Sequence, residues 1–129
     1  MINILYNVFF GLMGFAAILS LIYFPLWAVL HKLLPPKLDP ILFREPWFQK
    51  SELVNYQFFP LSLIRSLNYS YLIAWPSMAK RRRFKGLEQA LPVSAVATVL
   101  CKIHMSVGCI GALIAIPFFS IVVYTLLFL

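Results

Sequence analysis

Two long runs without a charged side chain lie toward the two ends of the chain and frame a charged middle. The first, Val8–Leu30, is 23 residues long, and the second, Met105–Leu129, is 25 residues long. As a helix, the shorter run is about 35 Å long, enough to cross a hydrocarbon core of about 30 Å with some tilt. Neither run alternates polar with apolar residues as a barrel strand does. The pattern therefore predicts two transmembrane helices.

The composition supports the same class of protein. Hydrophobic residues make up 62% of the 129 residues, and charged residues make up only 12%. A soluble domain of this size buries only about 60–70% of the surface that its unfolded chain exposes, too little to hide so much apolar surface. The five glycines and two cysteines exclude a collagen and a disulfide scaffold. We therefore expect an all-α integral membrane protein.

The first run differs from a secretory signal. No basic segment precedes it, its apolar stretch is too long, and no small-x-small cleavage site follows it. We expect residues 1–30 to be a retained transmembrane helix. Residues 91–129 are expected to form the second one, with a cytoplasmic N-terminal extension, so that the two make a hairpin.

The charged middle, residues 31–90, begins with a proline-rich segment. Fixed φ angles and missing N–H donors disfavour a long helix wherever prolines cluster. We therefore expect an extended or turn-rich connector over residues 31–50. Its prolines are Pro35, Pro36, Pro40 and Pro46.

A helix is predicted over residues 60–75, because proline suits a first helical turn and Pro76 ends the pattern. Sixteen residues are short for a span. We expect an amphipathic helix lying in the membrane interface, with Tyr69, Tyr71 and Trp75 at headgroup depth; a re-entrant hairpin is the alternative. Its polar stripe, at i, i+3, i+4 and i+7, is Ser62, Arg65, Ser66 and Tyr69.

The charges indicate an orientation. The chain has 11 basic and 4 acidic residues, a net charge of +7, and every charged residue except Lys102 lies within residues 31–90. Basic connections stay on the cytoplasmic side of a membrane. We expect this loop to be cytoplasmic and both ends of the chain to lie on the opposite side, with the bacterial inner membrane as the location.

A dense basic run follows the predicted interfacial helix. Near a membrane, each such charge contributes about 1 kcal/mol of attraction to anionic lipid. An acidic protein surface and nucleic acid are the other partners of such a run, but its shortness and its place after an interfacial helix favour lipid, and we expect no nucleic-acid partner. The basic residues are Lys80, Arg81, Arg82, Arg83 and Lys85.

Small residues recur at helical spacing in both predicted spans. They let another helix approach closely in lipid. Either the two helices of this chain pack on each other, or one of them docks a helix of another subunit. In the second span the pairs are Gly108 with Ala112 and Gly111 with Ala115, and the first span holds Gly11, Gly14, Ala17 and the pair Ala16 and Ser20.

Motifs for catalysis are missing from the sequence. The four acidic residues have no paired spacing, and there is no phosphate-binding loop, HExxH or CxxC. We expect neither an enzyme nor a metal site.

His31 follows the first span and His104 precedes the second. This placement permits axial ligation of haem b or a hydrogen bond to a quinone headgroup; two plain interfacial side chains are the alternative.

The leading hypothesis is a non-catalytic accessory subunit of a larger membrane protein complex, with other integral membrane subunits and anionic lipid as partners and no cofactor. A redox, quinone-site or haem-site subunit using His31 and His104 is the alternative. A small homo-oligomeric channel or transporter is the second alternative, for which the spans offer a thin supply of polar residues. Those residues are Asn7, Ser20, Ser106, Ser120 and Thr125.

Overall fold

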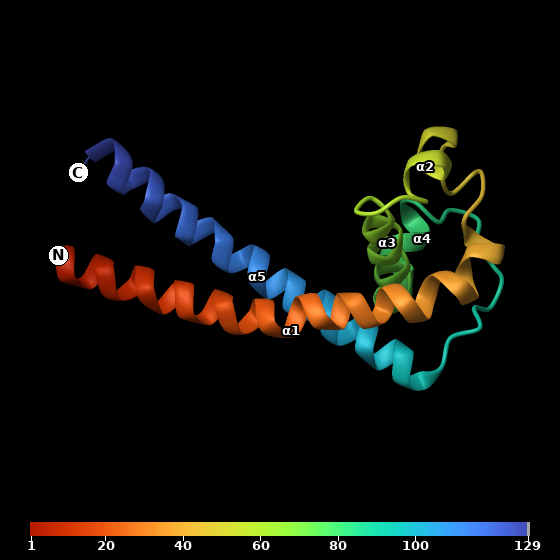
Figure 1. The fold of residues 1–129 in the computed structure, drawn as a ribbon, viewed down its shortest axis with the longest axis horizontal. Coiled ribbons are helices and arrows are strands. Elements are labelled where there is room, and N and C mark those ends of the chain that lie inside the picture. Colours follow the sequence, from red (N-terminus) through yellow and green to blue (C-terminus); the bar gives the residue numbers. More distant parts are fainter. Residues whose placement is uncertain (129) are drawn as a thin grey trace. The chain divides into compact units, whose positions relative to one another are not determined.

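The computed structural model describes residues 1–128, and within that range it contains helices and no strand. The helices are α1 (Ile2–Leu42), α2 (Lys50–Asn55), α3 (Ser62–Ala74), α4 (Pro76–Arg81) and α5 (Ala95–Phe128) (Figure 1). The chain divides into two compact units. Unit 1 comprises Met1–Phe24 and the chain from Ser106 onward, and unit 2 comprises Pro25–Met105.

Helices α1 and α5 are long and apolar enough to cross a membrane. They contain 41 and 34 residues. No residue is buried within the most apolar 18-residue window of either helix, whereas a core helix of a soluble protein buries such a stretch. The structure thus confirms the expected pair of helices that are able to span a membrane.

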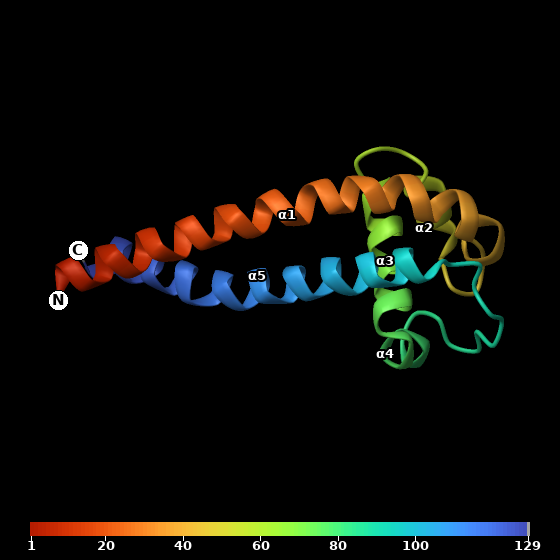
Figure 2. The same ribbon diagram turned by 90° about the horizontal axis from the view of Figure 1, so that it is seen from below.

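In unit 1, α1 and α5 run in opposite directions, so the start of α1 and the end of α5 lie at the same end of the unit (Figures 1 and 2). The rings of Phe9 and Phe118 stack with their centroids 5.2 Å apart. Nearer the other end, the ring of Tyr23 covers Gly108. Large side chains thus bridge the two helices.

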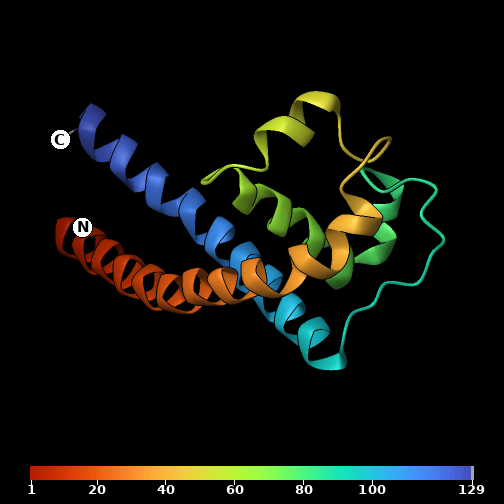
Figure 3. The same cartoon turned by 45° about the vertical axis from the view of Figure 1, so that its right-hand side comes forward.

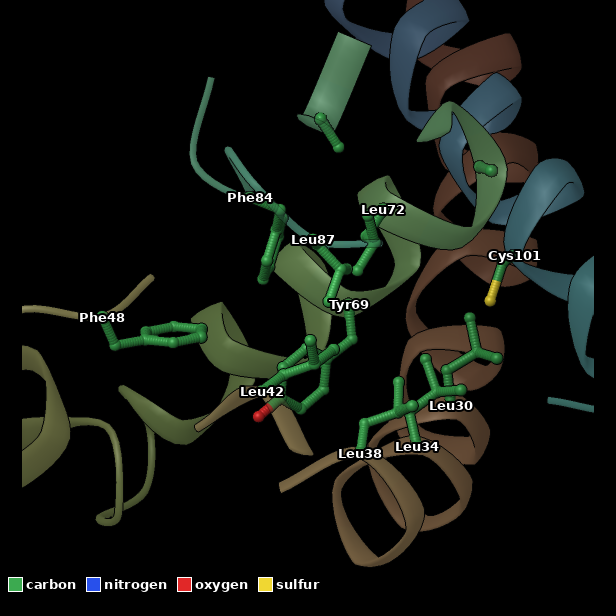
Figure 4. Close-up of a cluster of buried hydrophobic side chains, with 12 residues drawn as sticks. Leu30, Leu34, Leu38, Leu42, Phe48, Tyr69, Leu72, Phe84, Leu87 and Cys101 are labelled. Atoms are coloured by element: carbon green, nitrogen blue, oxygen red, sulfur yellow. The ribbon is translucent and has the colours of Figure 1, made fainter. Parts of the chain in front are cut away.

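Helix α1 continues through most of the expected connector, with Pro35, Pro36 and Pro40 inside it. The expectation of an extended or turn-rich segment is therefore wrong for residues 31–42. Each proline removes one backbone hydrogen bond, but continuing the helix buries a row of leucines at four-residue spacing. That row is Leu30, Leu34, Leu38 and Leu42, each at most 1% exposed (Figure 4).

The core of unit 2 forms where this leucine row meets α3 and the loops. Phe48 of this core is fully buried and meets four aromatic rings edge-on at centroid distances from 5.3 to 6.2 Å. Edge-on pairs add to the stabilisation that burial provides. The four rings belong to Phe43, Tyr56, Tyr69 and Phe84.

Helix α3 lies within the predicted range of residues 60–75. It ends where the N–H of Trp75 donates to the carbonyl of Tyr71 at 2.9 Å, and Pro76 then begins α4. Within unit 2, α3 crosses the last part of α1 at a steep angle (Figures 1 and 2). Residues 82–94, which connect α4 to α5, form a wide loop (Figure 3).

Candidate functional site

The polar face of α3 points into the protein. Ser66 and Tyr69 are fully buried, and the side chain of Arg65 is 14% exposed. Tyr69, which was expected at headgroup depth, is covered by side chains of the protein itself. Tyr71 and Trp75, which were expected beside it, are half-buried. The helix therefore turns its polar stripe toward α1 and its more apolar side outward.

Asp39 of α1 accepts contacts from two side chains of this stripe. The hydroxyl of Tyr69 donates to Asp39 Oδ1 at 2.6 Å, and Arg65 Nη1 lies 3.3 Å from Asp39 Oδ2. The Arg65 guanidinium also lies 4.8 Å from the centroid of the Phe43 ring. Burial, and then the bond to Asp39, raise the pKa of Tyr69, so its phenol remains a neutral donor.

Two further contacts hold α3 against α1. Trp27 Nε1 donates to the carbonyl of Leu63 at 3.1 Å. His31 Nδ1 and Ser66 Oγ share a hydrogen bond of 2.5 Å. Together with the Asp39 contacts, these bonds fix which face of α3 meets α1, because each pairs a polar group of α3 with one partner on α1.

The structure places both histidines in unit 2, against protein side chains. His31 is half-buried beside Ser66. His104 is fully buried, and its ring centroid lies 5.9 Å from that of Trp27. Among residues 1–128, no group of three or more His, Cys, Asp or Glu side chains is arranged to hold a metal ion.

The basic run separates into one internal residue and four exposed ones. Arg83 is half-buried and forms a two-pronged ion pair with Glu52, at 2.7 and 3.0 Å. Its Nη1 also donates to the carbonyl of Trp47 at 3.3 Å. The hydrogen bond from Arg83 is the main cause that lowers the pKa of Glu52. Lys80, Arg81, Arg82 and Lys85 remain exposed.

Every charged side chain of the protein is either exposed or part of an ion pair. Arg65 and Arg83, the two cations that are not exposed, pair with Asp39 and Glu52. The net charge of +7 therefore lies entirely on exposed residues of unit 2. The exposed acids are Glu45 and Glu88, and the exposed bases are Lys32, Lys37, Arg44, Lys50, Lys80, Arg81, Arg82, Lys85 and Lys102.

Unit 1 carries a groove of about 310 Å³ between α1 and α5. Small residues of both helices line it, beside larger ones such as Tyr23. Of the small residues singled out in the sequence, the groove brings together Ala16, Ser20, Gly108 and Gly111.

The other small residues do not line this groove. A Cβ built on Gly11 or Gly14 meets nothing within 4 Å among the described residues. Ala112 is exposed, and Ala115 is half-buried. Close packing through small residues is therefore not how α1 and α5 meet each other at these positions.

Sequence reasoning missed the partners of α3. The polar stripe of α3 could be predicted from the sequence, but the stripe alone does not indicate which residues of other helices contact it. The signal for Asp39 is that it directly follows Leu38 of the leucine row and precedes Leu42 by three residues. For Glu52 and Arg83, 31 positions apart, the sequence offers no comparable signal.

No family model, curated protein or solved structure matches this chain. Its function is therefore inferred from its own geometry. The two features that carry the inference are the groove of unit 1 and the charge distribution of unit 2.

Proposed function

We propose that this chain is a non-catalytic accessory subunit of a larger membrane protein complex. In this proposal α1 and α5 cross the membrane, and the groove of unit 1 takes a helix of another integral membrane subunit. The observation that carries the proposal is the groove itself, lined by Ala16, Ser20, Gly108 and Gly111. In lipid, no hydrophobic force joins helices, so small residues that permit close backbone approach favour association.

The surroundings of Gly108 and Gly111 support a partner helix from another subunit. The chain covers Gly108 with Tyr23, but a Cβ on Gly111 meets nothing within 4 Å among the described residues. The hydroxyl of Ser20 is satisfied within its own helix, because it donates to the carbonyl of Ala16 at 2.8 Å. Such a surface suits a helix that brings apolar side chains to a small-residue face.

The test replaces Gly111 with leucine. A Cβ at this position meets no other side chain within 4 Å among the described residues, and a longer side chain there extends into the groove. The matched control is Gly11→Leu, where a Cβ also meets nothing within 4 Å and which lies outside the groove. Each tagged variant is solubilised from its native membrane in mild detergent and sized by chromatography.

We expect the wild-type chain and Gly11→Leu to elute in a large complex. Gly111→Leu should lose at least half of that complex and elute mainly as a small species. Elution of the wild-type chain as a 14.8 kDa monomer in its detergent micelle would contradict the proposal. Equal behaviour of the two glycine variants would contradict the role of the groove.

We further propose that the basic loop, residues 31–90, faces the cytoplasm and that both ends of the chain lie on the other side of a bacterial inner membrane. Support comes from the nine exposed cations and two exposed acids of unit 2, since basic segments are retained on the inner side.

Cysteine labelling tests this orientation. A cysteine at Gln89, with Cys101 and Cys109 replaced by alanine, should react with an impermeant thiol reagent in inverted vesicles only. A cysteine at Asn3 should react in intact cells, and labelling of Gln89→Cys there would contradict this orientation.

A further inference from the structure

Helix α3 is built with its polar side inward and its apolar side outward. A helix on the surface of a soluble protein has the opposite arrangement, because its apolar stripe faces the core. Here the inward stripe holds Ser66, Tyr69 and Arg65, which bond to α1. The outward stripe follows helical spacing and is mostly aliphatic and aromatic. Its exposed members are Leu61 and Ile64. Asn68, Tyr71 and Trp75 continue the same spacing and are half-buried, and Tyr71 and Trp75 also pack against the core of unit 2.

The segment that leads into α3 is also apolar and exposed. Residues 58–61 are Phe-Phe-Pro-Leu, and all four are exposed. Phe58 and Phe59 are 65% and 78% exposed, respectively. A run of four exposed apolar residues is unfavourable in water and marks a surface that contacts something else. This segment, Phe58–Leu61, is called the apolar loop below.

The apolar loop lies close in the sequence to a residue that contacts the first predicted span. Leu63, two residues after the loop, accepts a 3.1 Å hydrogen bond from Trp27 Nε1, and Trp27 belongs to the uncharged run Val8–Leu30. Tryptophan is enriched where a span meets the headgroups. Because α3 starts beside Trp27 and crosses α1 steeply within unit 2 (Figure 2), α3 would lie along the membrane surface with the apolar loop beside the end of the first span.

Charge identifies the kind of lipid. The chain leaves the other end of α3 through Trp75 and enters α4 and the residues that follow it, where Lys80, Arg81, Arg82 and Lys85 are exposed. The one cation of this run with a carboxylate partner in the structure is Arg83. Exposed apolar side chains beside exposed cations suit a surface where acyl chains lie next to anionic headgroups. An anionic phospholipid leaflet is such a surface.

We infer that α3 lies in an anionic phospholipid leaflet, with the apolar loop among the acyl chains and Lys80, Arg81, Arg82 and Lys85 on the headgroup phosphates. This inference rests on the membrane insertion proposed above and not on the partner helix. The buried bonds of Tyr69 and Arg65 to Asp39 then have a role: they hold the polar face of α3 inward and so keep its apolar face toward lipid.

The experiment uses the purified full chain, without partners, in nanodiscs of phosphatidylcholine mixed with phosphatidylglycerol. With Cys101 and Cys109 replaced by alanine, a fluorophore is attached to Phe59→Cys and quenched by lipids carrying a nitroxide on the acyl chain. Leu113→Cys, on an exposed position of α5 in unit 1, reports whether the spans are inserted. Gln89→Cys, in the exposed loop after the basic run, reports a site in water.

We expect strong quenching at residues 59 and 113 and little at residue 89. At residue 59, nitroxide-labelled phosphatidylglycerol should quench about twofold more than labelled phosphatidylcholine at equal mole fraction, because the four cations enrich anionic lipid nearby. Changing Lys80, Arg81, Arg82 and Lys85 to glutamine should remove this preference. Arg83 is left in place in that variant, so that the ion pair with Glu52 is kept.

Two results would overturn the inference while leaving the spans inserted. The first is quenching at residue 113 without quenching at residue 59, which would mean that the apolar loop lies in water until a protein partner covers it. The second is equal quenching by the two lipids at residue 59 in the otherwise unchanged protein. Absence of quenching at residue 113 would overturn membrane insertion itself, and this inference with it.

Discussion

The hydroxyl of Tyr69, near the middle of α3, donates a 2.6 Å hydrogen bond to Oδ1 of Asp39, in the last turn of α1. Tyr69 is fully buried, so this bond replaces the water that its hydroxyl would otherwise bind. It joins two segments 30 positions apart in the sequence and decides which side of α3 faces the protein.

Replacing Tyr69 with phenylalanine keeps the ring and removes the donor. Asp39 then retains only the contact with Arg65. We expect a loss of about 1–2 kcal/mol in the free energy of unfolding, the usual contribution of a hydrogen bond to a charged group, because Asp39 is 29% exposed and keeps Arg65. Thermal or denaturant unfolding in detergent micelles measures it. Tyr71→Phe is the control, because Tyr71 is half-buried and its ring contact with Trp75 is kept. A Tyr69→Phe variant as stable as this control would contradict the prediction.

The pair Glu52 and Arg83 should be energetically coupled. Its two bonds of 2.7 and 3.0 Å have the parallel geometry that strengthens a carboxylate–guanidinium contact. In a double-mutant cycle with Glu52→Gln and Arg83→Gln, we expect a coupling energy of about 1 kcal/mol, because both side chains remain partly exposed. Arg82→Gln, at the exposed neighbour, should change stability little. Strictly additive effects of the two substitutions would show that the pair contributes nothing.

The same pair predicts a dependence of stability on pH. Hydrogen bonding to Arg83 lowers the pKa of Glu52 below its ordinary value of 4.5. A carboxyl group with a lowered pKa in the folded state stabilises the protein fully above the unfolded value and loses that contribution as pH falls through the folded value. The stability difference between the unchanged protein and Glu52→Gln should therefore be constant above pH 4.5 and shrink below it. A difference that stays constant down to about pH 2 would contradict this prediction.

Gly108 should tolerate a side chain less well than Gly111. A Cβ on Gly108 would lie 3.0 Å from Cε2 of Tyr23, closer than carbon atoms normally approach, whereas Gly111 has open space. We expect Gly108→Ala to cost about 1 kcal/mol as the tyrosine ring shifts, and Gly111→Ala to be neutral or stabilising. Unfolding of each variant in detergent measures this, and Tyr23→Ala should relieve the cost of Gly108→Ala. Equal stability of the two glycine variants would count against the contact.

The two ends of the molecule were more predictable than its middle. An uncharged run of more than 20 residues forms a helix in lipid whatever its neighbours are, because every backbone group must be satisfied within the segment. Residues 31–42 show the limit of local rules. Three prolines favour an extended chain there, but burial of Leu30, Leu34, Leu38 and Leu42 keeps the segment helical.

The candidate sites could also be predicted only in part from the sequence. The small residues and the basic run could be found in the sequence, but not which of them share a surface. The structure shows that Gly108 and Gly111 line one groove with Ala16 and Ser20. It also shows that Arg83 is paired with Glu52, unlike the exposed cations of the same run. These groupings depend on contacts between residues far apart in the chain.

The sequence by itself determined that the chain carries two helices able to span a membrane and a basic segment between them, because length, hydropathy and charge are properties of continuous segments. The tertiary structure alone decided the direction that α3 faces. A period of 3.6 residues separates a polar side from an apolar side but does not say which one meets the protein. That choice was made by partners on another helix, chiefly Asp39 and His31.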